Sequence, residues 1–261
     1  MNISLKGKKA LVGGSSAGIG KAIAIQLAKS GASVTLMSRS EDKLKAIVRG
    51  LPVDKGQNHQ YLKIDFTDFD SFKIVISEYF KSNSVDILVN NTQGPPPGSA
   101  LTKSIDDYQA AFDLLFKTVV YTTDLALENM QSNKFGRIIN ISSVSVKEPL
   151  SYLVLSNSIR TAVTAWAKSL TMDVGPDNIT INNTLTGYFN TERIEEIIRR
   201  KAAKTGISEA DVRENMESEV SVKRMGDPEE YANLVTFLAS DEAGYISGIN
   251  IPIDGGRLKS L

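Results

Sequence analysis

Cysteine is absent from the sequence, and histidine occurs once, at His59. The lack of cysteine excludes disulfide bonds, thiolate nucleophiles and cysteine-ligated zinc, while it leaves the redox compartment open. His59 lies beside a predicted strand and away from the candidate site residues, so we assign it no role. The acidic run DFTDFD at 65–70 is better explained by helix capping than by a bound cation, and we expect no metal site.

Long apolar runs and charge of a single sign are also missing. Thirty basic residues balance thirty acidic ones, and neither sign forms a block typical of a surface that binds nucleic acid or a membrane. No segment approaches the roughly 18 apolar residues of a membrane span, and the apolar run near the N-terminus is too short for a signal peptide. We therefore expect a cytoplasmic protein with a small neutral or modestly charged ligand and no nucleic-acid or membrane partner.

What the sequence does contain is a regular alternation of short Val-, Ile- and Leu-rich runs with longer segments of helical periodicity. This alternation is typical of βαβ units around a buried parallel sheet. With 261 residues and 41% apolar side chains, one domain covering 1–261 can bury a full core. We predict an α/β fold, a single-domain Rossmann-type doubly wound sheet of seven mainly parallel strands. The predicted strands lie at 8–14, 33–39, 60–66, 85–91, 136–143, 179–185 and 248–254.

Helices are predicted between these strands, at 18–29, 107–131, 151–173 and 228–240. Asp227 followed by Pro228 is typical of a capped helix start. The segment 190–222 departs from the alternation, because it carries two amphipathic helices where a short loop would suffice. An insertion of this kind at the carboxyl edge of the sheet is predicted to act as a lid.

A glycine-rich loop, VGGSSAGIG, follows the first predicted strand and leads into a helix. Gly14, Gly18 and Gly20 allow backbone N–H groups at the helix N-terminus to approach a pyrophosphate, because no Cβ atom intervenes. Ser16 and Ile19 lie between these glycines and are assigned to the same cofactor site. The spacing G-x-x-x-G-x-G differs from the G-x-G-x-x-G of the commoner dinucleotide fingerprint. A turn that only packs the helix on the strand is the alternative.

The end of the second predicted strand bears on the choice of cofactor. An acidic residue about 20 positions after the glycine loop binds the ribose 2′-hydroxyl of NAD and repels the 2′-phosphate of NADP. Here the strand ends in Ser38 and Arg39, and Arg39 offers a fork of hydrogen-bond donors to a phosphate. We therefore predict that NADP(H) is preferred over NAD(H). A solvated arginine at the head of the next helix is the alternative.

Several further motifs, in order along the chain, give it a family resemblance. They are DFTD at 65–68, NNTQG at 90–94, ISS at 141–143, NNTLTGYFNT at 182–191 and the run RMGDPEEYANLVTFLASDEAGYISGINIPIDGG at 224–256. Together with the glycine loop, they make the chain resemble the short-chain dehydrogenase/reductase family, and within it the β-ketoacyl-acyl carrier protein reductases.

The resemblance implies roles for residues outside the glycine loop. Asp65 and Phe66 would flank the adenine, Asn91 would belong to the cofactor site, and Gly187 with Thr191 would touch the nicotinamide end. A homodimer or homotetramer, formed through the two long central helices, is also implied.

The catalytic centre implied by the resemblance departs from the family pattern. The family uses Asn, Ser, Tyr and Lys, and the matching positions here are Leu115, Ser143, Ser156 and Arg160. In the family, Tyr protonates the carbonyl oxygen as hydride arrives, while Lys lowers the pKa of that Tyr and binds ribose. Ser156 is a poor acid, and Arg160 keeps a positive charge for the ribose but passes no proton onward. Only Ser143, which would orient the substrate, retains the family's residue type.

Two tyrosines are candidates for the missing acid. Tyr152 is predicted to lie one helical turn before Ser156, about 6 Å away, as a possible substitute acid. Tyr188, on the loop after the sixth predicted strand, is the second candidate. For each of them, packing in the core or at an oligomer contact is the alternative.

Two functions remain open from the sequence. The first is an NADP(H)-dependent oxidoreductase, similar to 3-oxoacyl-acyl carrier protein reductase, that transfers hydride between a ketone and an alcohol. Its small-molecule carbonyl or alcohol substrate would lie between the GPPPGS loop at 94–99 and the lid. The second is a catalytically weak or inactive nucleotide-binding homologue that acts as a sensor or scaffold. A narrower alternative is that nucleotide binding is lost as well.

Overall fold

Seven strands form the centre of the structure, a computed structural model that describes residues 3–260. Every strand pairing among these residues is parallel, and the order across the sheet is β3-β2-β1-β4-β5-β6-β7. The prediction of a seven-stranded Rossmann-type sheet is confirmed. The strands are β1 (Lys9–Val12), β2 (Ser33–Ser38), β3 (Gln60–Lys63), β4 (Ile87–Asn90), β5 (Gly136–Ser143), β6 (Ile179–Thr186) and β7 (Asn250–Ile253).

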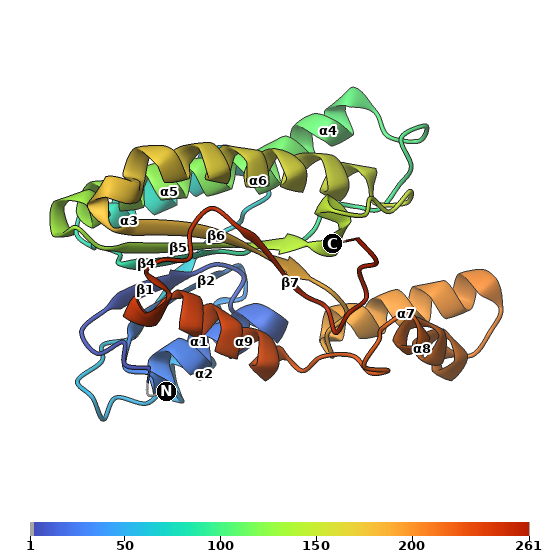
Figure 1. The fold of residues 1–261 in the computed structure, drawn as a ribbon, viewed down its shortest axis with the longest axis horizontal. Helices are drawn as coiled ribbons and strands as arrows, with labels where there is room; N and C mark the ends of the chain where they lie inside the picture. Colours follow the sequence, from blue (N-terminus) through green and yellow to red (C-terminus); the bar gives the residue numbers. More distant parts are fainter. Residues whose placement is uncertain (1–2, 261) are drawn as a thin grey trace.

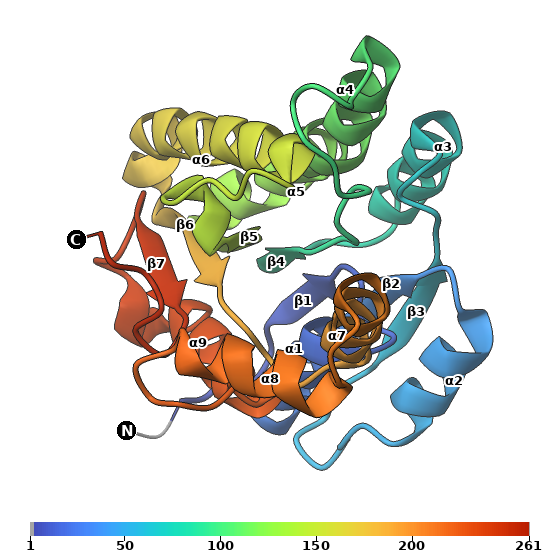
Figure 2. The ribbon, with the colours of Figure 1, turned by 90° about the vertical axis from the view of Figure 1, so that its right-hand side faces the viewer.

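Helices cover both faces of this sheet (Figure 1, Figure 2). One face carries α1, α2 and α9, and the opposite face carries α3, α5 and α6. The central strands β4, β5 and β6 are buried on both sides. The polar residues within β5 and β6, such as Asn140 and Asn183, are hydrogen-bonded inside the sheet. The helices are α1 (Gly18–Lys29), α2 (Glu41–Arg49), α3 (Phe69–Phe80), α4 (Ile105–Phe112), α5 (Thr118–Asn133), α6 (Val154–Val174), α7 (Glu192–Thr205), α8 (Glu209–Ser218) and α9 (Pro228–Leu238).

The chain reverses its course across the sheet between β1 and β4. From β1 it adds β2 and β3 on one side, and it then returns to add β4 to β7 on the other. In such sheets, ligands bind in the crevice beyond the carboxyl ends of the strands at the reversal. The glycine loop follows β1 at this edge, and Asn90 is the last residue of β4.

The helix predicted at 107–131 is interrupted in the structure. The helical run extends from Ile105 to Asn133, and a π-helical turn, Asp113–Lys117, separates α4 from α5. Such turns widen the helix locally and recur at functional sites. Here the turn contains Leu115, the position at which the family has its catalytic Asn.

Tyr152 lies outside helix α6, which begins at Val154 after Leu153 as its N-cap. The cause is a contact with a distant loop. The N–H of Gly98 donates to the carbonyl of Tyr152 at 2.8 Å, and Gly98 pairs with Leu153 in an isolated parallel bridge. This pairing holds Tyr152 out of the helix, so the prediction that it stacks one helical turn before Ser156 is wrong.

The segment between β6 and α9 forms two helices, α7 and α8, that project beyond the carboxyl edge of the sheet (Figure 1). An ion pair between Glu195 of α7 and Arg213 of α8 links them. The pair has an apolar cluster of its own, made by Ile194, Ile198, Ala202, Val212, Met216 and Met225. Its action as a lid stays a prediction.

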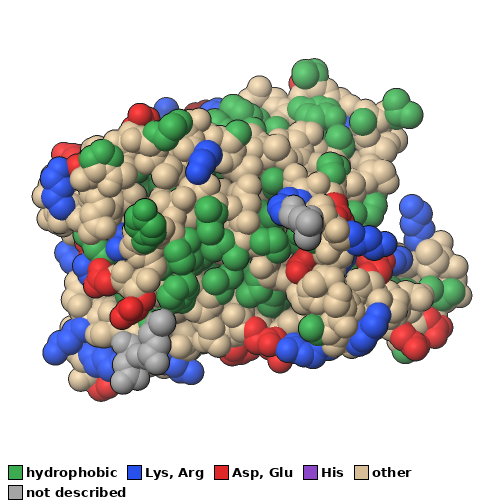
Figure 3. All heavy atoms as spheres, in the orientation of Figure 1, with side chains coloured by type: hydrophobic (Ala, Val, Ile, Leu, Met, Phe, Trp, Pro, Cys, Tyr) green, Lys and Arg blue, Asp and Glu red, His purple; other side chains and the backbone are tan. Residues whose placement is uncertain are grey.

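The surface mixes charges of both signs. On the face in Figure 3, basic and acidic side chains surround a central area where apolar side chains gather. None of the helices between residues 3 and 260 combines the length and the apolar character that a membrane crossing needs. Within the same range, no three or more His, Cys, Asp or Glu side chains gather as a metal-binding group would require.

His59 belongs to the framework of the sheet. Its Nδ1 accepts a hydrogen bond from the N–H of Val34 at 3.1 Å, and its Nε2 lies 2.8 Å from the carbonyl oxygen of Pro52. Since a carbonyl only accepts, the ring proton lies on Nε2. His59 therefore ties the loop before β3 to the start of β2.

The start of α9 is predicted to make folding stability depend on pH. Arg224 donates two hydrogen bonds of 2.7 Å to the carboxylate of Glu230, which also accepts from the N–H of Asp227. These contacts lower the pKa of Glu230 from 4.5 to about 2. Because the pKa is lower in the folded state, the stabilisation is complete above about pH 4.5 and is lost as the pH falls toward 2.

We expect Glu230→Gln to lower Tm at pH 7 by about 1–3 °C, since the pair is exposed. The difference from wild type should shrink as the pH falls and vanish near pH 2, as measured by calorimetry. Glu229→Gln is the matched control, because Glu229 makes no side-chain hydrogen bond or ion pair with the described residues. A Tm difference that stays constant from pH 7 to pH 2 would contradict the assignment.

Candidate active site

The glycine loop has the backbone geometry of an anion-binding turn. Gly14 has a positive φ of 55°, and a Cβ atom on Gly20 would lie 2.3 Å from the carbonyl oxygen of Gly14. Ala17, the N-cap of α1, supplies no side-chain cap. In the described part of the chain, the N–H groups of Gly18, Ile19 and Gly20 find no acceptor. Free N–H groups at the positive end of a 12-residue helix suit a phosphate group.

Asn91 ties this loop to the end of β4. Its Nδ2 donates to the carbonyl oxygen of Gly13 at 3.0 Å. A Cβ atom on Gly13 would lie only 2.3 Å from the carbonyl oxygen of Asn91. The glycine at position 13 therefore permits a close approach of two strand ends.

The residues predicted for the 2′-phosphate and the adenine, Arg39, Asp65 and Phe66, follow the neighbouring strands β2 and β3. Arg39, after β2, donates to Oε1 of Gln93 at 2.8 Å. Asp65, after β3, accepts hydrogen bonds from the N–H and Oγ1 of Thr67. Burial raises the pKa of Asp65, but these hydrogen bonds and the charge of Arg39 outweigh that effect and leave the pKa below its usual value. Phe66 lines a small cavity between the ends of β1 and β4.

The predicted nicotinamide-end residues lie where the α7–α8 segment begins. Thr191 is the N-cap of α7, and its side chain accepts a hydrogen bond from Ile194. A Cβ atom on Gly18 would lie 3.2 Å from Cγ2 of Thr191. Gly187 is packed closely against Asp254, which follows β7. The structure thus brings Thr191 to the glycine loop.

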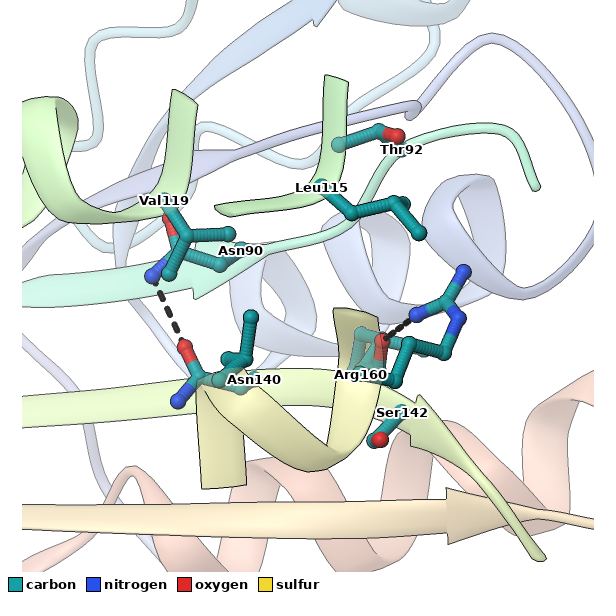
Figure 4. Close-up of a pocket in the computed structure, with 9 residues that line it drawn as sticks. Asn90, Thr92, Leu115, Val119, Asn140, Ser142 and Arg160 are labelled. Atoms are coloured by element: carbon teal, nitrogen blue, oxygen red, sulfur yellow. Dashed lines mark hydrogen bonds between the residues drawn. The ribbon is translucent and has the colours of Figure 1, made fainter. Parts of the chain in front are cut away.

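Three of the predicted catalytic residues, Ser143, Ser156 and Arg160, lie at or next to the end of β5, and Figure 4 shows Arg160 there beside Ser142. Arg160 donates through Nε to Oγ of Ser156 at 3.2 Å and through Nη1 to the carbonyl oxygen of Ile141 at 2.6 Å. Oγ of Ser143 accepts from the N–H of Ser145 at 3.2 Å. Both serine hydroxyls therefore accept one hydrogen bond and keep a proton to donate.

Arg160 has no carboxylate partner among residues 3–260. Burial lowers the pKa of its guanidinium, yet an arginine stays protonated in proteins. A half-buried cation without a counter-charge favours a ligand that carries or develops negative charge. This arrangement stabilises charge on an oxygen atom but supplies no acid in the usual pH range.

A small cavity adjoins Arg160. Its volume of about 20 Å³ is enough for one water molecule. Leu115 of the π-helical turn lines it, together with Asn140 and Ser142 of β5. Oγ of Ser142 is buried and has no hydrogen-bond partner among the described residues. The cavity is therefore polar on its sheet side, even though Leu115 replaces the family's Asn.

Neither candidate tyrosine is placed as an acid beside Ser156. The hydroxyl of Tyr188 donates to Oε2 of Glu219 at 3.1 Å, and Arg257 stacks over its ring. Burial is the main cause that raises the pKa of Tyr188 to about 12. Tyr152 is 55% exposed and precedes helix α6.

Tyr188→Phe tests this placement. Because the phenol stays protonated up to about pH 12, we expect the pH profile of turnover between pH 6 and 9 to be unchanged and the rate to stay within about twofold. The ring and its stacking with Arg257 are kept in this variant. Tyr152→Phe is the parallel variant. A loss of about 100-fold or more in turnover rate in either variant would show that its tyrosine acts as the acid.

Sequence reasoning missed three residues of this site. Gln93 contacts Arg39, Ser142 faces the cavity, and the buried hydroxyl of Tyr231 lies 2.7 Å from Oγ1 of Thr184. The only signals were Gln93 within the NNTQG motif and the serine pair at the end of β5. No sequence signal pointed to Tyr231, because its contact with Thr184 joins α9 to β6, which are distant in the sequence.

Comparison with known proteins agrees with this geometry. A family profile described as "Enoyl-(Acyl carrier protein) reductase" matches residues 14–257. The NADPH-dependent reductase BacG of Bacillus subtilis is 32% identical over 258 residues, covering 97% of this chain and 99% of BacG. The 3-oxoacyl-[acyl-carrier-protein] reductase FabG of Haemophilus influenzae is 34% identical over 257 residues, covering 97% of this chain and 98% of FabG.

Solved structures show the same architecture. YwfH, an NADPH-dependent reductase involved in bacilysin biosynthesis, matches with a TM-score of 0.90 and 31% identity, over 97% of this chain and 99% of YwfH. L-sorbose reductase from Gluconobacter frateurii, solved with NADPH and L-sorbose, matches with a TM-score of 0.92 and 29% identity over the whole of both chains. With the parallel sheet, the glycine loop and the strand-end residues in place, this chain belongs to the short-chain dehydrogenase/reductase family.

Proposed function

We propose that the protein is an NADP(H)-dependent oxidoreductase of the 3-oxoacyl-acyl carrier protein reductase type, acting on a small-molecule carbonyl or alcohol. The observation that carries the proposal is the uncapped N-terminus of α1, whose N–H groups are free, at the same carboxyl edge of the sheet as Arg39 and Ser143. This arrangement supports a dinucleotide on one side and a reacting carbonyl on the other.

The residues present fit NADP(H). Gly14, Gly18 and Gly20 leave room for the pyrophosphate, and Arg39 offers a cation to the 2′-phosphate. Asp65 and Phe66 would flank the adenine, while Thr191 would approach the nicotinamide end, and a bound cofactor would supply or accept the hydride. The relatives BacG and YwfH are described as NADPH-dependent, which supports this choice.

In this proposal, the polarising groups are Ser143, Ser156 and Arg160. The two hydroxyls donate hydrogen bonds to the substrate oxygen, and the guanidinium behind Ser156 stabilises the negative charge that develops on it. An aliphatic hydroxyl is too weak an acid to protonate that oxygen, so water supplies the proton. We therefore expect slower turnover than a tyrosine-based site gives.

The test combines binding with turnover. NADPH is expected to raise Tm more than NADH does at equal concentration. Ketones and 3-oxoacyl thioesters are then assayed by the loss of NADPH absorbance. Gly14→Val is the control, because a side chain at φ 55° is strained and would lie 2.8 Å from the side-chain nitrogen of Asn91. Substrate-dependent oxidation of NADPH in wild type, absent in the control, is the expected result.

A nucleotide-binding protein without turnover is the second candidate. It is favoured by Leu115 in the π-helical turn, where the family has its Asn, and by the hydrogen bond of Tyr188 to Glu219, which engages that candidate acid elsewhere. Cofactor binding with no turnover on any carbonyl or alcohol would favour this second function over the first.

A cytoplasmic location and a homodimer or homotetramer complete the proposal. The oligomer is supported by exposed apolar side chains at Met172, Tyr245 and Ile249.

A further inference from the structure

A hydrogen bond joins the two loops that flank the glycine loop. Arg39, just after β2, donates through Nη2 to Oε1 of Gln93, in the loop after β4, at 2.8 Å. Strand β1 lies between β2 and β4 in the sheet, so this contact bridges the strand end from which the glycine loop begins. Both side chains are exposed, and core packing therefore does not force them together.

The contact directs Arg39 without cancelling its charge. Gln93 is a neutral amide, so the guanidinium keeps its full positive charge. Two acids lie near it in the chain and in the sheet, and neither forms an ion pair with it, although the charge of Arg39 helps to lower the pKa of Asp65. Glu41 pairs with a lysine of its own helix at 2.7 Å, and Asp65 accepts hydrogen bonds of 2.9 and 2.7 Å from Thr67. Arg39 is thus available to an anion at the adenosine end of the crevice.

We propose that Gln93 is a positioning residue for cofactor selectivity, which holds the Arg39 guanidinium ready for the 2′-phosphate of NADP(H). The inference rests on the proposed function and adds the residue that sets its cofactor preference. A long side chain that is ordered before binding loses less entropy on binding, and the gain is about three- to tenfold in affinity. NAD(H) lacks the 2′-phosphate, so the gain applies to NADP(H) alone.

Dissociation constants for NADPH and NADH, measured by fluorescence titration, test the proposal, with 2′,5′-ADP and 5′-AMP as competing fragments. Gln93→Ala is expected to weaken NADPH about three- to tenfold and to leave NADH within about twofold. Gln93→Glu, which sets a carboxylate against the guanidinium and near the phosphate, is expected to weaken NADPH by about tenfold or more. Gln60→Glu adds the same charge at the exposed start of β3 and serves as the matched control.

An Arg39→Ala background separates positioning from direct contact. If Gln93 acts through Arg39, Gln93→Ala causes no further loss of NADPH affinity in that background. Additive losses, or equal losses for NADPH and NADH, overturn the inference, because a merely structural role would weaken both cofactors alike. An unchanged NADPH to NADH ratio in Gln93 variants with wild-type Tm also overturns it and leaves the proposed function intact. A wild-type chain that binds neither cofactor overturns both.

Discussion

The double variant Ser156→Tyr, Arg160→Lys is expected to reduce ketones with NADPH about 100-fold faster than the wild-type chain. The physical reason is the supply of a proton. An ordinary phenol has a pKa of about 10, and a nearby ammonium lowers it toward the working range. A serine hydroxyl starts far higher, and the guanidinium of Arg160, although 3.2 Å from Oγ of Ser156, stabilises an oxyanion without protonating it.

The single variants separate the acid from the cation. Arg160→Lys alone restores no acid, so we expect no gain, whereas Ser156→Tyr alone should gain part of the effect because the cation remains. Adding Ser143→Ala to the double variant should remove about tenfold or more, since its hydroxyl is the remaining donor at the end of β5. The measurement is kcat under saturating NADPH, with Tm and NADPH affinity recorded for each variant.

A pH profile provides the signature of the new acid. In the double variant, kcat should fall at high pH as the phenol loses its proton. The wild-type kcat should show no such fall at high pH. A folded double variant that binds NADPH and turns over no faster than wild type would show that the missing phenol does not limit the reaction.

Patterns local in the chain predicted most of the fold. The short runs rich in Val, Ile and Leu, alternating with segments of helical periodicity, located all seven strands. The start of α1 within the glycine loop and the start of α9 after Asp227 were also predicted correctly, since the signals at a helix start lie within one turn. Ser156 and Arg160 lie four positions apart on α6, and their contact also follows from helical spacing.

The features that could not be predicted from the sequence depend on contacts between distant segments. Tyr152 has helical periodicity with Ser156, but its carbonyl accepts from Gly98, 54 positions earlier in the chain. Gln93 contacts Arg39 because their strands, β4 and β2, are the two neighbours of β1 in the folded sheet, and both residues follow the carboxyl end of their strand. Neither contact can be predicted from residue spacing within a single helix or strand.

A ladder of asparagine side chains crosses the sheet beside the site. Asn90 of β4 donates to Asn140 of β5 at 2.9 Å, Asn140 donates to Asn183 of β6 at 2.9 Å, and Asn183 donates to Asn250 of β7 at 2.8 Å. The four residues are direct partners in the strand register. Since Asn140 is 2% exposed and also lines the cavity next to Arg160, the ladder couples sheet stability to the geometry of the site.

Asn140→Ala is expected to lower the free energy of unfolding by about 2–5 kcal/mol. The variant removes the acceptor at 2.9 Å from Nδ2 of Asn90, which keeps only the longer hydrogen bond to Thr123 at 3.3 Å, and the donor to Oδ1 of Asn183, at about 1–3 kcal/mol for each group. Asn250→Ala is the matched control: Asn250 is exposed at the end of the ladder, so water replaces its oxygen and the loss should stay below about 1 kcal/mol. Urea unfolding with unchanged m-values measures both. Equal losses in the two variants would mean that the buried middle of the ladder contributes no more than its exposed end.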